Sequence, residues 1–219
     1  ARVIASHPTA TLISDEIYED LTYPEIATGV GPFSPGSLPE LRDRTVTLNG
    51  LSKSMAMTGW RIGWAVAPGD DGAIAKAMTR LQSQMTSGIA TFLMPAACEA
   101  IRRQPETSGP MRAVFAERAR LVAELLGGIE RFTTVAPSGA FYVFPDVSAC
   151  FGLTSPGGRL IDSAGSFAEA LLEEKEVAVV PGDDFGEIAR NHVRLSFACG
   201  EDQIRAGVGR IRAWVDALA

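Results

Sequence analysis

The stretch Gly50-Leu-Ser-Lys-Ser-Met-Ala-Met-Thr-Gly-Trp-Arg-Ile-Gly63 is the most informative part of the chain, because it joins two predicted strands through a loop that holds a lysine. Burial in such a semi-apolar loop disfavours the ammonium form of Lys53, which makes its amine a nucleophile toward carbonyl compounds. The hydroxyl of Ser52 and the planar guanidinium of Arg61 are a suitable pair for a phosphate. The alternative is a lysine that reaches solvent from a hairpin, with Arg61 in an ordinary ion pair.

A second group of candidate residues follows an apolar run over residues 11–14, which predicts a buried strand. Asp15 stands where this strand ends, and Tyr18 comes soon after it. Ligands bind at the carboxyl ends of strands in open α/β sheets. A carboxylate there could therefore pair with the ring nitrogen of a pyridine cofactor, and Tyr18 could donate to a phenolate oxygen. The alternative is that Ser14 or Asp15 caps a short helix and Tyr18 is half-buried core.

Arg194 is the third candidate. It alternates with Val193, Leu195 and Phe197 in a predicted strand, so its side chain faces away from the core. A strand arginine that points into a cleft binds a carboxylate through two parallel hydrogen bonds. The alternative is an exposed arginine on an edge strand.

The composition excludes several classes of protein. The net charge of −6 argues against a surface that binds nucleic acid. Three cysteines without a CxxC pair and only two histidines favour a reducing compartment and argue against a metal site. No apolar run reaches the length of a membrane span, and the first residues do not resemble a signal peptide. We therefore expect a cytoplasmic protein that binds neither membranes nor nucleic acid.

Hydrophobic periodicity predicts an α/β first half and an α+β second half. The predicted strands cover residues 45–49, 61–67, 141–144, 177–180 and 193–197, and the predicted helices cover 74–85, 95–103, 111–129, 167–174 and 204–218. The segment 104–110 holds two prolines and a glycine, so we expect a boundary there.

Together these segments resemble the fold-type I pyridoxal-phosphate enzymes, specifically the class I and II aminotransferases of the bacterial aspartate aminotransferase kind. The matching segments are residues 14–18, 50–63, 137–144 and 193–198, with Pro181-Gly182 and Phe185-Gly186 between the last two. The resemblance implies an α/β fold of the pyridoxal-phosphate-dependent transferase type. It places the C-terminal part of the large cofactor-binding domain in residues 1–108 and a small α+β domain in residues 109–219.

The resemblance also implies a role for each candidate residue of the first half. Lys53 would bind pyridoxal 5'-phosphate covalently and, once released, would act as general base at the substrate Cα. Asp15 would bind the pyridinium nitrogen and Tyr18 the O3′ oxygen of the cofactor. Ser52 and Arg61 would bind the phosphate.

In the second half, Arg194 would bind the α-carboxylate of the substrate. The implied reaction moves an amino group between an L-amino acid, aspartate-like or of broad kind, and a 2-oxo acid. The family further implies a homodimer with the active site near the subunit interface. Residues 82–87 are either a contact loop of that dimer or the end of a helix.

Chains of this family are longer before the Asp15 strand, so we expect a fragment, namely the C-terminal half of an aminotransferase; a truncated, catalytically silent gene product is the other explanation. The first residues then resemble the last turn of a helix. We expect this polypeptide alone to bind the cofactor poorly and to expose apolar surface where further strands would pair. Three other functions stay open: a β-lyase of sulfur amino acids or another fold-type I enzyme, the effector domain of a transcription regulator, and a degenerate dimer partner.

Overall fold

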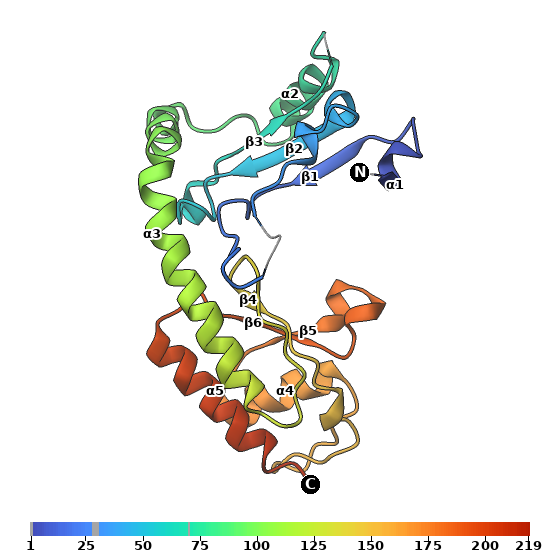
Figure 1. Cartoon of the computed structure of the whole chain (residues 1–219), viewed down its shortest axis with the longest axis vertical. Helices are drawn as coiled ribbons and strands as arrows, with labels where there is room; N and C mark the ends of the chain where they lie inside the picture. The colour runs from blue at the N-terminus through green and yellow to red at the C-terminus, as the bar shows by residue number, and fades with distance from the viewer. Residues whose placement is uncertain (1, 28–30, 70) are drawn as a thin grey trace. The chain divides into compact units, whose positions relative to one another are not determined.

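The computed structural model describes residues 2–27, 31–69 and 71–219, and the chain divides into two compact units (Figure 1). The first unit comprises Ala1–Thr22 and Val30–Arg112. The second comprises Tyr23–Gly29 and Ala113–Ala219. Ala1, the residue at which we expected a helix to enter, lies outside the described residues, and α1 spans Arg2–Ala5.

A three-stranded sheet organises the first unit. Strands β1 (Leu12–Asp15), β2 (Thr45–Gly50) and β3 (Gly63–Val66) lie in the order β1-β2-β3. β1 and β2 run parallel, whereas β3 is antiparallel to β2. Because β1 and β2 are parallel, their carboxyl ends meet at one edge of the sheet, and both candidate segments of this unit leave the sheet there.

The loop between β2 and β3 leaves the sheet at two paired glycines, Gly50 and Gly63. A Cβ added to Gly50 would lie 2.8 Å from the carbonyl oxygen of Ile62, so only glycine permits this close approach of the two strands. Strand β3 (Gly63–Val66) is shorter at both ends than the strand predicted over residues 61–67. Arg61 lies before it, at the end of the short 3₁₀ helix η3 (Thr58–Trp60).

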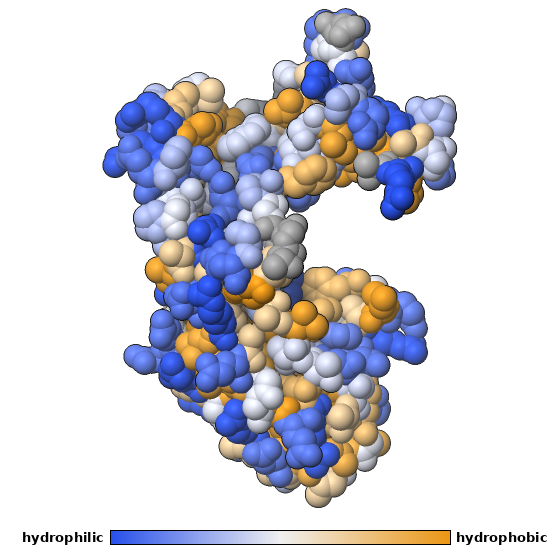
Figure 2. Space-filling model, in the orientation of Figure 1, coloured by the Kyte–Doolittle hydropathy of each residue, from blue (hydrophilic) through white to orange (hydrophobic). Residues whose placement is uncertain are grey.

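Helix α2 (Ala73–Met85) confirms the predicted helical spacing. Residues 82–85 are its last turn, so the helix-end interpretation of residues 82–87 is correct for that part. Its apolar side chains are exposed, and so are apolar side chains of the sheet, as the space-filling view of this unit shows (Figure 2). The exposed apolar residues of the sheet and of α2 are Ile13, Trp64, Val66, Ile74, Met78, Leu81 and Met85. The unit also contains the 3₁₀ helices η1 (Pro35–Ser37), η2 (Arg42–Arg44) and η4 (Thr91–Leu93).

Helix α3 (Met94–Gly127) continues through Pro105 and Pro110, so the separate helices predicted over residues 95–103 and 111–129 are not present, although the division between the two units lies nearby, at Arg112 and Ala113. A proline removes one helical N–H and bends a helix, but it ends the helix only when the neighbouring turns are weak. Here the hydroxyls of Thr107 and Ser108 also donate to backbone carbonyls one turn earlier, at 3.2 and 2.9 Å, and bonds of this kind bend a helix without ending it. Two predicted helices are thus one.

The second unit holds another three-stranded sheet, which is antiparallel and has the order β4-β6-β5. Its strands are β4 (Tyr142–Val143), β5 (Val180–Pro181) and β6 (Val193–Ser196). All three are shorter than predicted, and β5 overlaps the strand predicted over residues 177–180 only at Val180. The helices are α4 (Ala164–Lys175) and α5 (Glu201–Val215), together with the last turns of α3. The 3₁₀ helices η5 (Ser148–Cys150), η6 (Gly182–Phe185) and η7 (Glu187–Ala189) complete it.

The core of this unit lies between the sheet and its helices. Trp214 of α5 is fully buried and packs edge-on against Phe167 of α4, with ring centroids 5.1 Å apart. Such edge-to-face pairs of buried aromatic rings add to the stability that comes from removing apolar surface from water. The apolar stripe predicted for the last helix is buried here, at Ile204, Val208, Ile211 and Val215.

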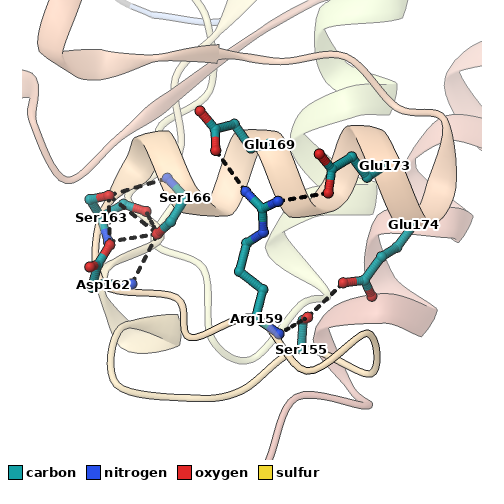
Figure 3. A network of polar contacts seen from close by, with 8 residues as sticks. All are labelled: Ser155, Arg159, Asp162, Ser163, Ser166, Glu169, Glu173 and Glu174. Atoms are coloured by element: carbon teal, nitrogen blue, oxygen red, sulfur yellow. Dashed lines mark hydrogen bonds and ion pairs between the residues drawn. The ribbon is translucent and has the colours of Figure 1, made fainter.

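A polar network ties the segment before α4 to the helix itself (Figure 3). The guanidinium of Arg159 donates to the carboxylates of Glu169 and Glu173, at 2.7 and 2.8 Å. The hydroxyl of Ser155 donates to Glu174 at 2.6 Å. Because carboxylates close together on a helix repel one another, these donors stabilise the acidic C-terminal half of α4.

Among the described residues, no helix combines the length and the apolar character that crossing a membrane requires.

Candidate active site

Asp15 ends β1 and opens a turn. Its Oδ1 atom accepts a hydrogen bond from the backbone N–H of Ile17 at 3.2 Å, and the N–H of Glu16 donates to the carbonyl of Leu48 on β2 at 2.8 Å. The chain then turns through a half-buried Tyr18, and no helix begins here. The capping alternative is therefore wrong: the Asp15 carboxylate is exposed at the carboxyl end of a strand.

Lys53 lies against Tyr18, with its Nζ atom 5.7 Å from the centroid of the Tyr18 ring. Its loop is closed at the base by backbone hydrogen bonds, from Leu51 to Ile62 at 3.1 Å and from Met57 to Leu51 at 3.2 Å. Because Lys53 is half-buried in a tight loop, its side chain has less conformational freedom than a lysine on the surface of a helix. The tertiary fold thus brings together two candidates from separate strand ends.

Ser52 and Arg61 flank the backbone hydrogen bond that joins Leu51 to Ile62. Arg61 adopts a left-handed conformation with φ of 56°, and its Nη1 atom donates to the carbonyl of Thr58 at 2.9 Å. Within the described ranges no carboxylate forms an ion pair with it, so the ordinary salt bridge of the alternative interpretation is not present. A guanidinium without a carboxylate partner retains donors for a phosphate.

A contact that the sequence did not predict joins the two candidate segments. Asn49, near the end of β2, donates from Nδ2 to the Oε1 atom of Glu19 at 2.5 Å, and its Oδ1 atom accepts from the N–H of Gly50 at 2.7 Å. Burial raises the pKa of Glu19, the bond from Asn49 opposes that rise, and the nearby carboxylates of Asp20 and Glu16 add to it. The bond ties the turn after Asp15 to the start of the lysine loop.

Arg194 belongs to the second unit, where it lies on β6, the central strand of the sheet. The edge-strand alternative is therefore wrong. Its guanidinium carbon lies 4.6 Å from the ring centroid of Tyr142 and 4.6 Å from that of Phe185. In the part of the chain that the structure describes, no carboxylate pairs with it. The sequence pointed to the arginine but not to the two rings.

The polar groups of the first unit suit a phosphorylated pyridine aldehyde. They comprise an amine, an acidic group, a phenol, a hydroxyl and a guanidinium, supplied by Lys53, Asp15, Tyr18, Ser52 and Arg61. An amine binds the aldehyde, a carboxylate the ring nitrogen, and the hydroxyl and guanidinium the phosphate. Across residues 2–27, 31–69 and 71–219, no cluster of three histidine, cysteine or acidic side chains is placed to hold a metal ion.

Comparison with known proteins gives concordant results. The family model for "Aminotransferase class I and II" matches residues 1–211. The aspartate/prephenate aminotransferase of Cereibacter sphaeroides is 39% identical over 218 residues, which are 99% of this chain and 52% of that protein. The aspartate aminotransferase of Geobacillus stearothermophilus is 43% identical over 209 residues, 95% of this chain and 50% of that protein.

A solved structure agrees with these sequence matches. The crystal structure of the aspartate aminotransferase from Rhizobium meliloti superposes with a TM-score of 0.90 at 35% identity, covering all of this chain (100%) and 52% of that one. The chain thus spans about half the length of the curated relatives and of the solved structure that it matches.

Proposed function

Because this chain belongs to the class I and II aminotransferases and has their pyridoxal-phosphate-dependent, fold-type I architecture, we propose that it forms part of an enzyme that transfers an amino group between an L-amino acid and a 2-oxo acid. The observation that carries the proposal is the contact between Lys53 and Tyr18 where β1 and β2 end. A nucleophilic amine beside a phenol, with a carboxylate close by in sequence, suits covalent binding of a pyridine aldehyde.

In this proposal, residues of the first unit hold pyridoxal 5'-phosphate. The amine of Lys53 binds its aldehyde carbon, Asp15 accepts a hydrogen bond from the ring nitrogen, and Tyr18 donates to the O3′ oxygen. Ser52 and Arg61 bind the phosphate through charge-assisted hydrogen bonds. The bound cofactor supplies a cationic ring that accepts electrons and a carbon that carries the amino group.

The remaining steps belong to side chains of this chain. Once released from its bond, the amine of Lys53 acts as the general base that takes the proton from the substrate Cα. The guanidinium of Arg194 binds the α-carboxylate of the substrate through two parallel hydrogen bonds. An amino acid of aspartate-like or broad kind is the proposed donor, because the matched relatives include aspartate aminotransferases.

Family membership also supports a proposal for the whole protein. We propose that residues 1–108 are the C-terminal part of the large cofactor-binding domain and that residues 109–219 are the small domain. We propose a cytoplasmic homodimer whose ligands are an amino acid and a 2-oxo acid, with no role for nucleic acid or a membrane.

The test measures amino-group transfer by the full-length protein that carries this sequence. ¹⁵N-labelled aspartate and 2-oxoglutarate are supplied with pyridoxal phosphate, and labelled glutamate is detected. We expect transfer by the wild type and a loss of at least about a thousandfold in Lys53→Ala, which lacks both nucleophile and base. Lys76→Ala is the matched control, since Lys76 lies on α2 and donates to the carbonyl of Asp71 at 2.6 Å.

Release of ammonia with a 2-oxo acid, without labelled glutamate, would indicate a lyase instead. Lys53→Ala protein that retains transfer would contradict the proposed role of Lys53. A separate experiment titrates the 219-residue chain alone with pyridoxal phosphate. We propose that this chain by itself binds the cofactor weakly. An absorbance band on adding pyridoxal phosphate that Lys53→Ala abolishes would refute that statement.

A further inference from the structure

Two aromatic rings contact the guanidinium of Arg194, and they come from either side of its strand. Tyr142 belongs to β4, which pairs with one side of β6, and Phe185 ends η6, which follows β5 on the other side. Each ring centroid lies 4.6 Å from the guanidinium carbon, within the distance of a cation–π interaction. The guanidinium thus lies against two rings, and no carboxylate of the described ranges forms an ion pair with it.

The position of Phe185 is built into the loop that carries it. The N–H of Gly182 donates to the carbonyl of His192 at 2.8 Å, and the N–H of His192 donates to that of Ala189 at 2.8 Å. A Cβ on Gly182 would lie 1.9 Å from the Ala189 oxygen, so a glycine is required for the loop to fold back this far. The close approach of Gly182 to the backbone of Ala189 and His192 therefore fixes the position of Phe185 in this loop.

The ring of Phe185 is also supported from behind. Phe144 lies edge-on to it, with centroids 5.7 Å apart, and the imidazole of His192 stacks on Phe144 at 5.0 Å and 20°. Phe185 is nevertheless 45% exposed. A large apolar side chain that is half exposed yet fixed by a second ring and a constrained loop contributes little to a core, which points to a role at the surface it faces.

We propose that Phe185, together with Tyr142, is a positioning residue that holds the guanidinium of Arg194 in the orientation that binds a substrate carboxylate. The inference rests on the proposed function of Arg194. An arginine side chain loses rotational freedom about several bonds when it binds a ligand, which costs conformational entropy. Rings that restrict the side chain beforehand lower this entropic cost for every carboxylate ligand. Because the rings take no part in proton transfer, their effect falls on substrate binding and leaves the chemical step unchanged.

The experiment compares Phe185→Leu, which keeps an apolar side chain but no ring, with Phe185→Trp, which restores a π face. The full-length protein is used, and Ile188→Ala serves as the control, since Ile188 lies on the same loop and is 93% exposed. Two quantities are measured: the KM and kcat for aspartate, and the affinity for propionate by calorimetric titration, which needs no turnover.

We expect Phe185→Leu to raise KM and to weaken propionate binding by about three- to tenfold, with kcat within about twofold of the wild type. Phe185→Trp retains the wild-type affinity, and Ile188→Ala changes nothing. In an Arg194→Lys background, Phe185→Leu causes a much smaller further loss, because the two residues act through one interaction.

Three results would overturn the proposal: equal loss in Phe185→Leu and Phe185→Trp, an undiminished loss in the Arg194→Lys background, or propionate binding that Phe185→Leu leaves unchanged. Wild-type protein that binds propionate no better than Arg194→Lys overturns it as well. A wild type that binds propionate through Arg194 but transfers no amino group contradicts the proposed function alone.

Discussion

The Nζ atom of Lys53 lies 5.7 Å from the centroid of the Tyr18 ring, and this contact joins the turn after β1 to the loop after β2. Two parallel strands carry the two segments to the same edge of the sheet, and the Asn49–Glu19 hydrogen bond holds the segments together. The amine of Lys53 therefore lies against the aromatic ring of Tyr18.

Two substitutions of Tyr18 distinguish the contribution of its hydroxyl to cofactor binding from that of its ring. Tyr18→Phe removes the hydroxyl and with it the proposed hydrogen bond to the cofactor, so we expect the affinity for pyridoxal phosphate to fall about three- to tenfold. Tyr18→Leu also removes the ring beside Lys53 and lowers the affinity further, by about twofold to fivefold. Spectrophotometric titration of the cofactor-free full-length protein measures both values. Unchanged affinity in both variants would mean that Tyr18 only packs against the loop.

Gly182 provides a test of the loop that positions Phe185. Gly182→Ala places a Cβ 1.9 Å from the Ala189 oxygen, and because backbone surrounds it we expect the free energy of unfolding to fall by about 3 kcal/mol or more. Gly207→Ala is the control: Gly207 lies within α5, and a Cβ there meets no atom within 4 Å. That change should stabilise the protein by about 0.5–1 kcal/mol. Urea unfolding measures both; similar stabilities of the two variants would contradict the close approach of Gly182.

Glu174 makes stability depend on pH. Burial raises the pKa of its carboxyl, but hydrogen bonds from Ser155, Trp214 and the N–H of Gly157, together with Lys175, outweigh that effect and leave the pKa below its ordinary value. A carboxyl whose pKa is lowered in the folded state stabilises that state above its unfolded pKa, and the contribution disappears as the pH falls through the folded pKa.

We therefore expect Glu174→Gln to lower the free energy of unfolding by about 1 kcal/mol near neutral pH, since the network is partly exposed. The difference from the wild type should shrink as the pH drops from about 6 to about 3. Urea unfolding at a series of pH values measures it. Glu124→Gln, a change at an exposed position of α3, is the control and should show no such trend. A difference independent of pH would assign the effect of Glu174→Gln to packing.

The three cysteines should differ in reactivity. Burial raises the pKa of the Cys150 thiol to about 11, with a smaller opposing effect of Arg131, so almost no thiolate is present near neutral pH. Cys98 is exposed and Cys199 is partly exposed. In iodoacetamide labelling followed by peptide mass spectrometry, we expect Cys98 to react first and Cys150 only after denaturation. Rapid labelling of Cys150 in the native protein would contradict its burial.

The sequence alone was sufficient for the lysine loop and for most elements. Helices with a clear period, such as α2 and α5, were predicted because apolar residues at helical spacing mark one face of a helix. That face is buried in α5 and exposed in α2. The two helices predicted over residues 95–103 and 111–129 are one in the structure, because proline content is a local signal, whereas the continuity of a helix depends on the backbone of the flanking turns. The boundary expected at residues 104–110 lies close to the division between the two units, at Arg112 and Ala113.

For the candidate site, too, the sequence predicted some features and only the tertiary structure decided others. Side-chain chemistry is a property of residue type and local spacing, so the sequence by itself predicted Lys53, Asp15 and Arg194 as candidate functional residues and indicated which family the chain resembles. Contacts between segments distant in sequence depend on strand order, register and loop closure, which no local pattern encodes. Only the tertiary structure placed Lys53 against Tyr18, and only it placed aromatic rings on the guanidinium of Arg194.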